Sequence, residues 1–215
     1  MEELRCRYPW PDEKPIDIKP IDHGWFNNPE KIKALKAVIK PEFKILVEIG
    51  AWLGQSTRIL LDSSNANAVV ISIDHWKGSN EHQGNRFAFL PVLYETFIVN
   101  MWEHRERLIP IRENSLTGLQ VIDVVNLKPD LVLIDASHEY EDILADLEMT
   151  YKLFPNARIC GDDYNWMAPK DRCFNPSRLP TNDIYYPVRR AVKAFCANHK
   201  LKHGSSGQCG FWIIN

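Results

Sequence analysis

Three aspartates and one histidine in the second half of the chain could together perform proton and cation chemistry. Asp135 closes one apolar run, and Asp162 and Asp163 close the next. Because parallel strands end at one edge of a sheet, we expect these carboxylates to lie within a few ångströms of one another. Like charges so close must be protonated, held apart or bridged by a cation, and all-oxygen ligands favour Mg²⁺, Mn²⁺ or Ca²⁺. His138 follows Asp135 by three residues, and a neutral imidazole there could remove a proton from a hydroxyl group.

The same residues also allow a purely structural interpretation. Asp135 could cap the helix that follows it, and Asp163 could cap a turn. His138 could be an ordinary surface histidine in the first turn of that helix. The residue types and their spacing leave both interpretations open.

A glycine turn is the second feature whose spacing points to a ligand. Residues 44–49 form an apolar run typical of a buried parallel strand, and Gly50 and Gly54 follow it. Glycine lets a ligand approach bare backbone, and Ser56 suits the first turn of the next helix. The spacing matches neither the dinucleotide fingerprint nor the phosphate loop. Glu48 would repel a pyrophosphate but would suit a cationic amino acid, and a turn without any ligand is the alternative.

Three further residues are candidates for contacts with a nucleoside. Asp74 ends the next apolar run. An acidic residue at the end of the second strand, about twenty residues after the first glycine, is where nucleotide-binding α/β folds hold ribose hydroxyls. Trp76 could offer an aromatic face to an adenine, or it could simply pack in the core. Ser115 follows the short apolar run 108–111 and is a weaker candidate.

Length and composition indicate one globular domain. The chain has 215 residues, of which 45% are hydrophobic and 25% charged, which is ordinary for a soluble protein. A net charge of −2 gives no reason to expect nucleic acid or an anionic membrane surface as a partner. We find neither a secretory signal nor a membrane span, and the scattered cysteines favour reduced thiols, so we expect a cytoplasmic protein.

Alternating strand and helix patterns are expected to position these residues. Residues 1–30 are rich in proline and charge and predict an extended arm, which could lie on the domain or on a second copy of the chain. Trp10, Trp25 and Phe26 would anchor this arm, whereas Lys31 and Lys33 are expected on a solvated helix face. Residues 31–215 would form the domain, with strands at 44–49, 69–73, 108–111, 130–134, 157–161, 201–203 and 211–214 and helices at 30–39, 56–62, 87–102, 140–151 and 188–198.

The glycine turn resembles motif I of the class I S-adenosylmethionine (SAM) methyltransferases. The match is in the E-x-G-x-x-x-G-x-S form of O-methyltransferases, across residues 48–56. Residues 73–78, 81–84 and 134–140 resemble methyltransferases common near glycan-building enzymes, and residues 161–164 are similar to the macrocin and mycinamicin sugar O-methyltransferases.

This resemblance implies a fold, a cofactor and roles for particular residues. It implies an α/β fold: a single Rossmann-like domain whose mostly parallel, seven-stranded sheet has the order 3-2-1-4-5-7-6, with helices on both faces. SAM would contact a set that comprises Glu48, Gly50, Ala51, Gly54, Ser56, Asp74, Trp76, Ser115 and Asp135. Asp135, Asp162 and Asp163 would hold Mg²⁺, and His138 would be the base. The resemblance does not extend to residues 165–187; their length and prolines suggest an acceptor lid, with weak acceptor candidates at Tyr164, Trp166, Arg172 and Arg178, and ordinary loop packing is the alternative.

Three functions remain open at this point. The first is a metal-dependent O-methyltransferase that acts on a hydroxyl of a sugar or glycan. The second keeps the cofactor and the metal but takes a catechol-like small molecule as acceptor. The third is a non-catalytic module with the same fold, which binds a partner through its proline-rich arm. A nicotinamide oxidoreductase is disfavoured by the glycine spacing.

Overall fold

The computed structural model describes residues 1–78, 87, 89–168, 186–207 and 209–214, and its centre is one seven-stranded sheet. The strand order is β3-β2-β1-β4-β5-β7-β6, which confirms the expected order. β7 pairs antiparallel with both β5 and β6, while the other neighbours are parallel. The strands are β1 (Ile45–Ile49), β2 (Val69–Ile73), β3 (Leu108–Ile111), β4 (Leu131–Ile134), β5 (Arg158–Gly161), β6 (His203–Ser205) and β7 (Trp212–Ile214).

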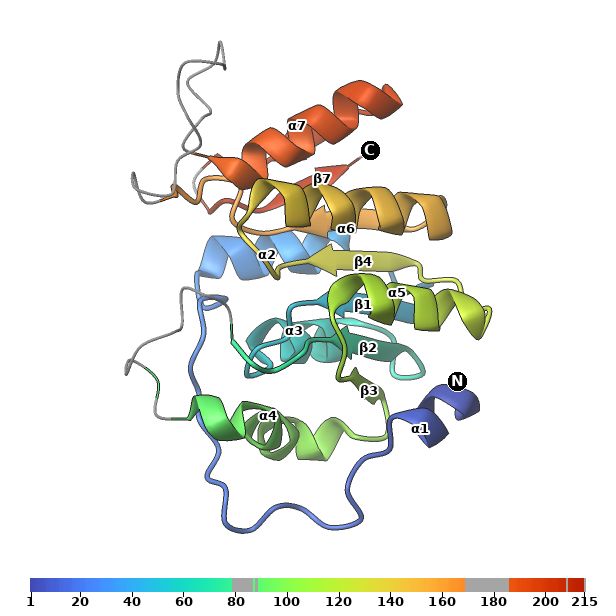
Figure 1. The fold of residues 1–215 in the computed structure, drawn as a ribbon, viewed down its shortest axis with the longest axis vertical. Helices are drawn as coiled ribbons and strands as arrows, with labels where there is room; N and C mark the ends of the chain where they lie inside the picture. The colour runs from blue at the N-terminus through green and yellow to red at the C-terminus, as the bar shows by residue number, and fades with distance from the viewer. Residues whose placement is uncertain (79–86, 88, 169–185, 208, 215) are drawn as a thin grey trace.

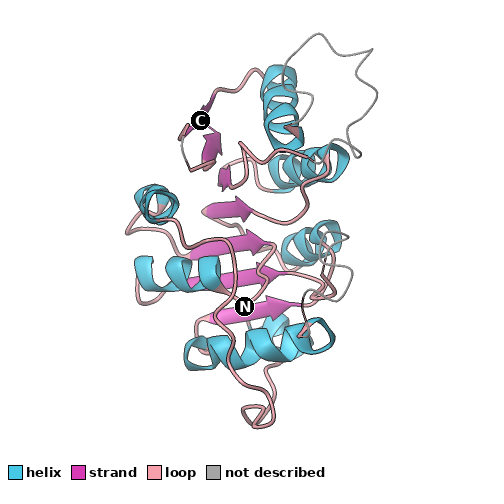
Figure 2. Cartoon of the chain, turned by 90° about the vertical axis from the view of Figure 1, so that its left-hand side faces the viewer, coloured by secondary structure: helices cyan, strands magenta, loops and turns pink. Residues whose placement is uncertain are grey.

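Helices cover both faces of the sheet (Figures 1 and 2). One apolar core packs the sheet against α1 (Glu2–Arg7), α5 (Ser115–Val124), α6 (Tyr140–Leu153) and α7 (Pro187–His199). The other packs it against α2 (Pro29–Val38), α3 (Gln55–Ser63) and α4 (Leu93–Met101), with the short 3-10 turns η2 (Leu90–Val92) and η3 (Trp102–His104) flanking α4. β1, β2, β4 and β5 therefore end together at one edge of a sheet that is covered on both faces.

Three elements differ from the sequence-based expectation. The arm begins with the helix α1, because Leu4 is fully buried in the core and the acidic first turn and basic last turn suit the helix dipole. The helix expected over 87–102 is broken into η2, α4 and η3, with Pro91 in η2. No helix was expected at residues 115–124, where the structure has α5. Gly118 lies inside this helix, where a Cβ would lie 2.5 Å from Ile73 Cγ2, so the glycine lets the helix pack closely on β2.

Among the described residues, every helix is too short or too polar to cross a bilayer. Trp10 and Phe26 do anchor the arm. Trp10 Nε1 donates to the Leu108 carbonyl oxygen at 3.0 Å, and Phe26 is 5% exposed. Trp25, by contrast, is 55% exposed and lies at the mouth of a cavity.

Candidate active site

A cavity of about 810 Å³ opens where β1, β2, β4 and β5 end. It brings together residues that are far apart in the sequence, from the glycine turn, from the ends of the strands and from the arm. The predicted site residues that line it are Gly50, Ala51, Ser56, Asp74, Ser115, Asp135, His138, Asp162, Asp163 and Trp166. A single cavity therefore contains both the residues predicted to bind a cofactor and the residues predicted to bind a cation and to transfer a proton.

The glycine turn presents backbone to this cavity. Gly50 has a φ of +91°, and a Cβ at this position would lie 2.0 Å from the Asp135 carbonyl oxygen. Only glycine fits here, since any side chain would collide with the backbone of the neighbouring strand end. Gly54 also has a φ of +91° and is the N-cap of α3, so the turn leads directly into a helix N-terminus.

Asp74 holds the loops on either side of it. One of its carboxylate oxygens accepts a hydrogen bond from the Trp52 N–H at 2.9 Å, and the other accepts from the Trp76 N–H at 2.7 Å. Asp74 also lines the cavity. Its bonds to two backbone amides fix its position before any ligand arrives.

Four predicted residues lie outside the cavity wall. Two of them are Glu48 and Gly54. Glu48 is fully buried and accepts hydrogen bonds from the hydroxyls of Thr57 and Ser72. Trp76 is 2% exposed; its indole packs on Tyr94 and Phe97, so its ring is not presented to a ligand. Tyr164 is 6% exposed, and its hydroxyl bonds His203 Nε2 at 2.8 Å. The two remaining acceptor candidates, Arg172 and Arg178, and most of the segment 165–187 lie outside the described residues.

Burial of Glu48 predicts a pH-dependent stability. Burial raises the pKa of Glu48 to about 7, against the lowering effect of the hydroxyls of Ser56, Thr57 and Ser72. Between the pKa of Glu48 in the unfolded chain and its pKa of about 7 in the folded protein, Glu48 binds a proton in the folded state but not in the unfolded state. The free energy of unfolding of the wild type therefore falls as the pH rises towards 7. Because Glu48→Gln lacks this titration, its stability relative to wild type should increase by about 2–3 kcal/mol between about pH 5 and pH 8. Urea denaturation at both pH values measures this difference, and a constant difference would contradict it.

The three predicted aspartates come together as the sequence suggested. One carboxylate oxygen from each of Asp135, Asp162 and Asp163 lies within 4.8 Å of the others. Burial, followed by the charges of Asp162 and Asp163, raises the pKa of Asp135. Burial and Asp163 raise the pKa of Asp162 to about 6. Although burial alone would raise the pKa of Asp163, the hydrogen bond from His138 holds it below its usual value.

His138 is fixed beside this cluster. Its Nε2 lies 2.8 Å from Asp163 Oδ2, and its ring lies 4.5 Å from the ring of Trp166 at an interplanar angle of 30°. Asp163 reaches it from the end of β5 with a φ of +58°, a left-handed conformation that is uncommon for a residue with a side chain. The strand end and the loop after β4 therefore place an imidazole and a carboxylate in contact at the cavity wall.

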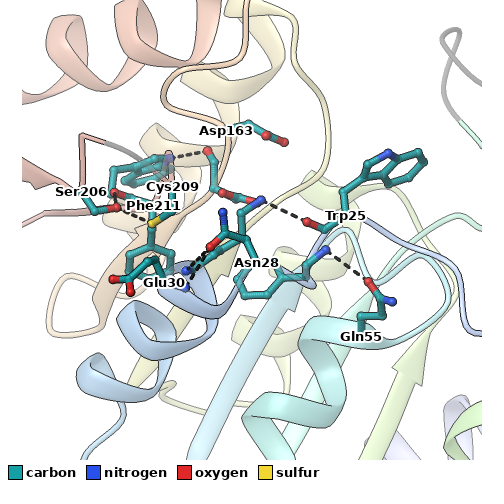
Figure 3. Close-up of polar contacts among 12 residues, drawn as sticks. Trp25, Asn28, Glu30, Gln55, Asp163, Ser206, Cys209 and Phe211 are labelled. Atoms are coloured by element: carbon teal, nitrogen blue, oxygen red, sulfur yellow. Dashed lines mark hydrogen bonds and ion pairs between the residues drawn. The ribbon is translucent and has the colours of Figure 1, made fainter.

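Lys31 is the largest departure from the sequence-based expectation. Instead of lying on a solvated face of α2, its side chain is 8% exposed and its Nζ forms an ion pair with Asp162 Oδ2. Nζ also donates to the Trp25 carbonyl oxygen at 3.3 Å (Figure 3) and lies 5.2 Å from the centre of the Phe26 ring. Although burial alone would lower the pKa of Lys31, the charges of the three nearby aspartates raise it. The lysine therefore joins the arm to the acid cluster.

Four other residues that line the cavity were not predicted as site residues from the sequence. Trp25, Trp52 and Phe87 pack edge to face or tilted at the mouth, with ring centres 5.6–6.2 Å apart. Asp146 of α6 also lines the cavity and is 2% exposed; burial raises its pKa to about 7, while a hydrogen bond with Ser115 opposes the shift. The signal for Asp146 was present, because it sits on the apolar face of an amphipathic helix.

A family model described as a methyltransferase domain matches residues 47–164, which is more than half of the chain. The chain belongs to this family. The matched residues of the methyltransferase domain span the glycine turn, the ends of β2 and β4 and the acid cluster, whereas Lys31 and Trp25 precede them. The family match thus covers most of the cavity but not the arm that closes one side of it. No curated protein sequence matches this methyltransferase domain.

Solved structures share the fold of this methyltransferase domain. It is similar to the O-methyltransferase from Bacillus cereus solved in complex with SAH, with 18% identity, a TM-score of 0.60 and coverage of 99% of this chain and 88% of that chain. It is also similar to TomG from Streptomyces achromogenes, an O-methyltransferase involved in tomaymycin synthesis and solved in complex with SAM. There the identity is 17%, the TM-score is 0.63, and the match covers 87% of this chain and 79% of that chain. At these identities the similarity concerns the fold.

Proposed function

We propose that this methyltransferase domain transfers the methyl group of SAM to a hydroxyl oxygen. The observation that supports this most strongly is the cavity itself. It runs from Gly50 and Asp74, which suit a nucleoside and an amino acid, to His138 and the acid cluster, which suit a hydroxyl group. A donor and an acceptor bound at the two ends would be held in one space, and such positioning is a large part of catalysis.

One buried carboxylate oxygen supports binding of a divalent cation by the acid cluster. Asp162 Oδ1 is buried, and it has no hydrogen-bond partner among the described residues. A buried carboxylate oxygen without a partner is costly, and a cation beside Asp135, Asp162 and Asp163 would satisfy it. Mg²⁺, Mn²⁺ or Ca²⁺ would fix a hydroxyl oxygen of the acceptor and lower its pKa, while SAM supplies an electrophilic methyl group.

His138 is the proposed base. Because His138 holds the pKa of Asp163 below its usual value, the Asp163 carboxylate accepts the hydrogen bond from His138 Nε2–H. In the neutral tautomer that keeps this hydrogen bond, Nδ1 carries the lone pair that would take the proton. Asp163 then stabilises the imidazolium that forms. Trp166, packed on the imidazole ring, restricts its rotation.

The proposed acceptor is a sugar or glycan that carries neighbouring hydroxyl groups. The charged end of the cavity and the resemblance of residues 161–164 to sugar O-methyltransferases support this choice. A catechol-like phenol is the second candidate, and a different observation favours it. The aromatic rings of Trp25, Trp52 and Phe87 line the mouth of the cavity and would pack well on an aromatic acceptor.

Calorimetric titration with SAM and with S-adenosylhomocysteine, each in Mg²⁺ and in EDTA, tests the proposal. We expect micromolar binding of both compounds, after which sugars and catechols can be screened as acceptors by methyl transfer. Absence of binding under every condition would contradict the proposed function and would favour a non-catalytic binding module.

A further inference from the structure

Lys31 places a positive charge beside the three carboxylates of the acid cluster. Its side chain is almost fully buried, its ammonium group is paired with Asp162 Oδ2, and the Trp25 carbonyl oxygen holds that group from the other side. The ring of Phe26 lies against the same group. The contacts with Trp25 and Phe26 come from the arm just before α2, so the lysine is held by the segment that carries it.

The lysine does not block the cluster. It bonds one oxygen of Asp162 and leaves the other, Oδ1, buried and without a hydrogen bond from the part of the chain that the structure describes. Lys31 is not among the described residues that line the cavity. Its effect on the site acts through the hydrogen bond that orients the Asp162 carboxylate and through its positive charge, which all three aspartates feel.

The charge effect opposes a divalent cation. The carboxylates that would bind a cation are negatively charged when ionised, and the ammonium group offsets one such charge. A cation bound among the same carboxylates would also be repelled by the ammonium group at short range, where burial weakens solvent screening. Lysines on the exposed part of the helix, such as Lys33, lie in water and would contribute much less.

We propose that Lys31 is a built-in counter-ion of the three-aspartate cluster and lowers its affinity for a divalent cation. This inference rests on the proposed function, because the cation is the one assigned to the same aspartates. Lys31 is thus a positioning residue that keeps the acid cluster assembled in the absence of metal and weakens metal binding.

Calorimetric titration of Mn²⁺ into the full-length protein tests this role. Lys31→Gln removes the charge but keeps a hydrogen-bond donor, Lys31→Arg keeps the charge, and Lys33→Gln removes an equal charge from the exposed face of α2. We expect Lys31→Gln to bind Mn²⁺ at least about tenfold more tightly than wild type. The Arg variant and the Lys33→Gln control should stay within about threefold of wild type, because each keeps the buried charge.

The outcomes separate this inference from the proposed function. S-adenosylhomocysteine binding, measured in the same samples, reports on the methyltransferase proposal alone. Equal or weaker Mn²⁺ binding by Lys31→Gln, or no binding by any of the proteins, would overturn the counter-ion role even where S-adenosylhomocysteine binds. If Lys31→Gln is unfolded in EDTA, Mn²⁺ should refold it, as followed by circular dichroism, and failure to refold would also overturn the role.

Discussion

Replacing His138 by alanine is expected to lower the turnover number for methyl transfer by about 100-fold or more. The dissociation constant for S-adenosylhomocysteine should change by less than about threefold. The physical reason is that Asp163 holds His138 Nε2 at the end of the cavity that carries the acid cluster. Removal of the imidazole should therefore impair proton removal from the acceptor hydroxyl and leave binding of the nucleoside intact. Steady-state kinetics with the acceptor found in the screen, together with calorimetry, measure both quantities.

His104→Ala is the matched control for this variant. His104 lies in η3, away from the cavity wall, so its loss should leave both quantities unchanged. A His138→Ala protein that retains more than about a tenth of wild-type turnover would remove the histidine from the proposed mechanism. A large loss of S-adenosylhomocysteine binding would instead indicate a structural role.

Asp162→Ala is expected to lower the free energy of unfolding, measured in EDTA, by about 3–5 kcal/mol. The reason is that this variant leaves the buried ammonium group of Lys31 without its carboxylate. The double variant Lys31→Met with Asp162→Leu should recover most of this loss, since apolar side chains of similar volume often replace a buried ion pair without cost. Urea denaturation of the single and double variants measures the difference.

An exposed ion pair supplies the control. Lys128 and Asp123 form a contact of 3.2 Å with side chains that are 61% and 38% exposed, so Asp123→Ala should cost less than about 1 kcal/mol. Equal losses for Asp162→Ala and Asp123→Ala would show that the buried pair contributes no more than a surface pair. A double variant as unstable as Asp162→Ala would place the loss in the packing around Asp162.

Local sequence determined most of the strands, the glycine turn and the acid cluster, whereas the order of the strands was implied by the family resemblance. Buried parallel strands show uninterrupted apolar runs, and the residue that ends each run must lie at the shared edge of the sheet. Asp74, Asp135 and Asp162 could therefore be placed at one edge from the order of residues alone. The sequence also placed Gly50 in a tight turn open to a ligand, whereas the lack of room for a Cβ beside the Asp135 carbonyl oxygen is visible only in the fold.

Tertiary packing decided what the local pattern left ambiguous. Lys31 resembles any lysine of an amphipathic helix, and only the packing of α2 against the end of β5 brings it to Asp162. Trp76 and Glu48 have residue types that suit a ligand, but their orientation is set by neighbours on α4, α3 and β2 that are distant in sequence. Periodicity states which face of an element is buried; which partner that face meets depends on contacts between elements, and these form only in the folded chain.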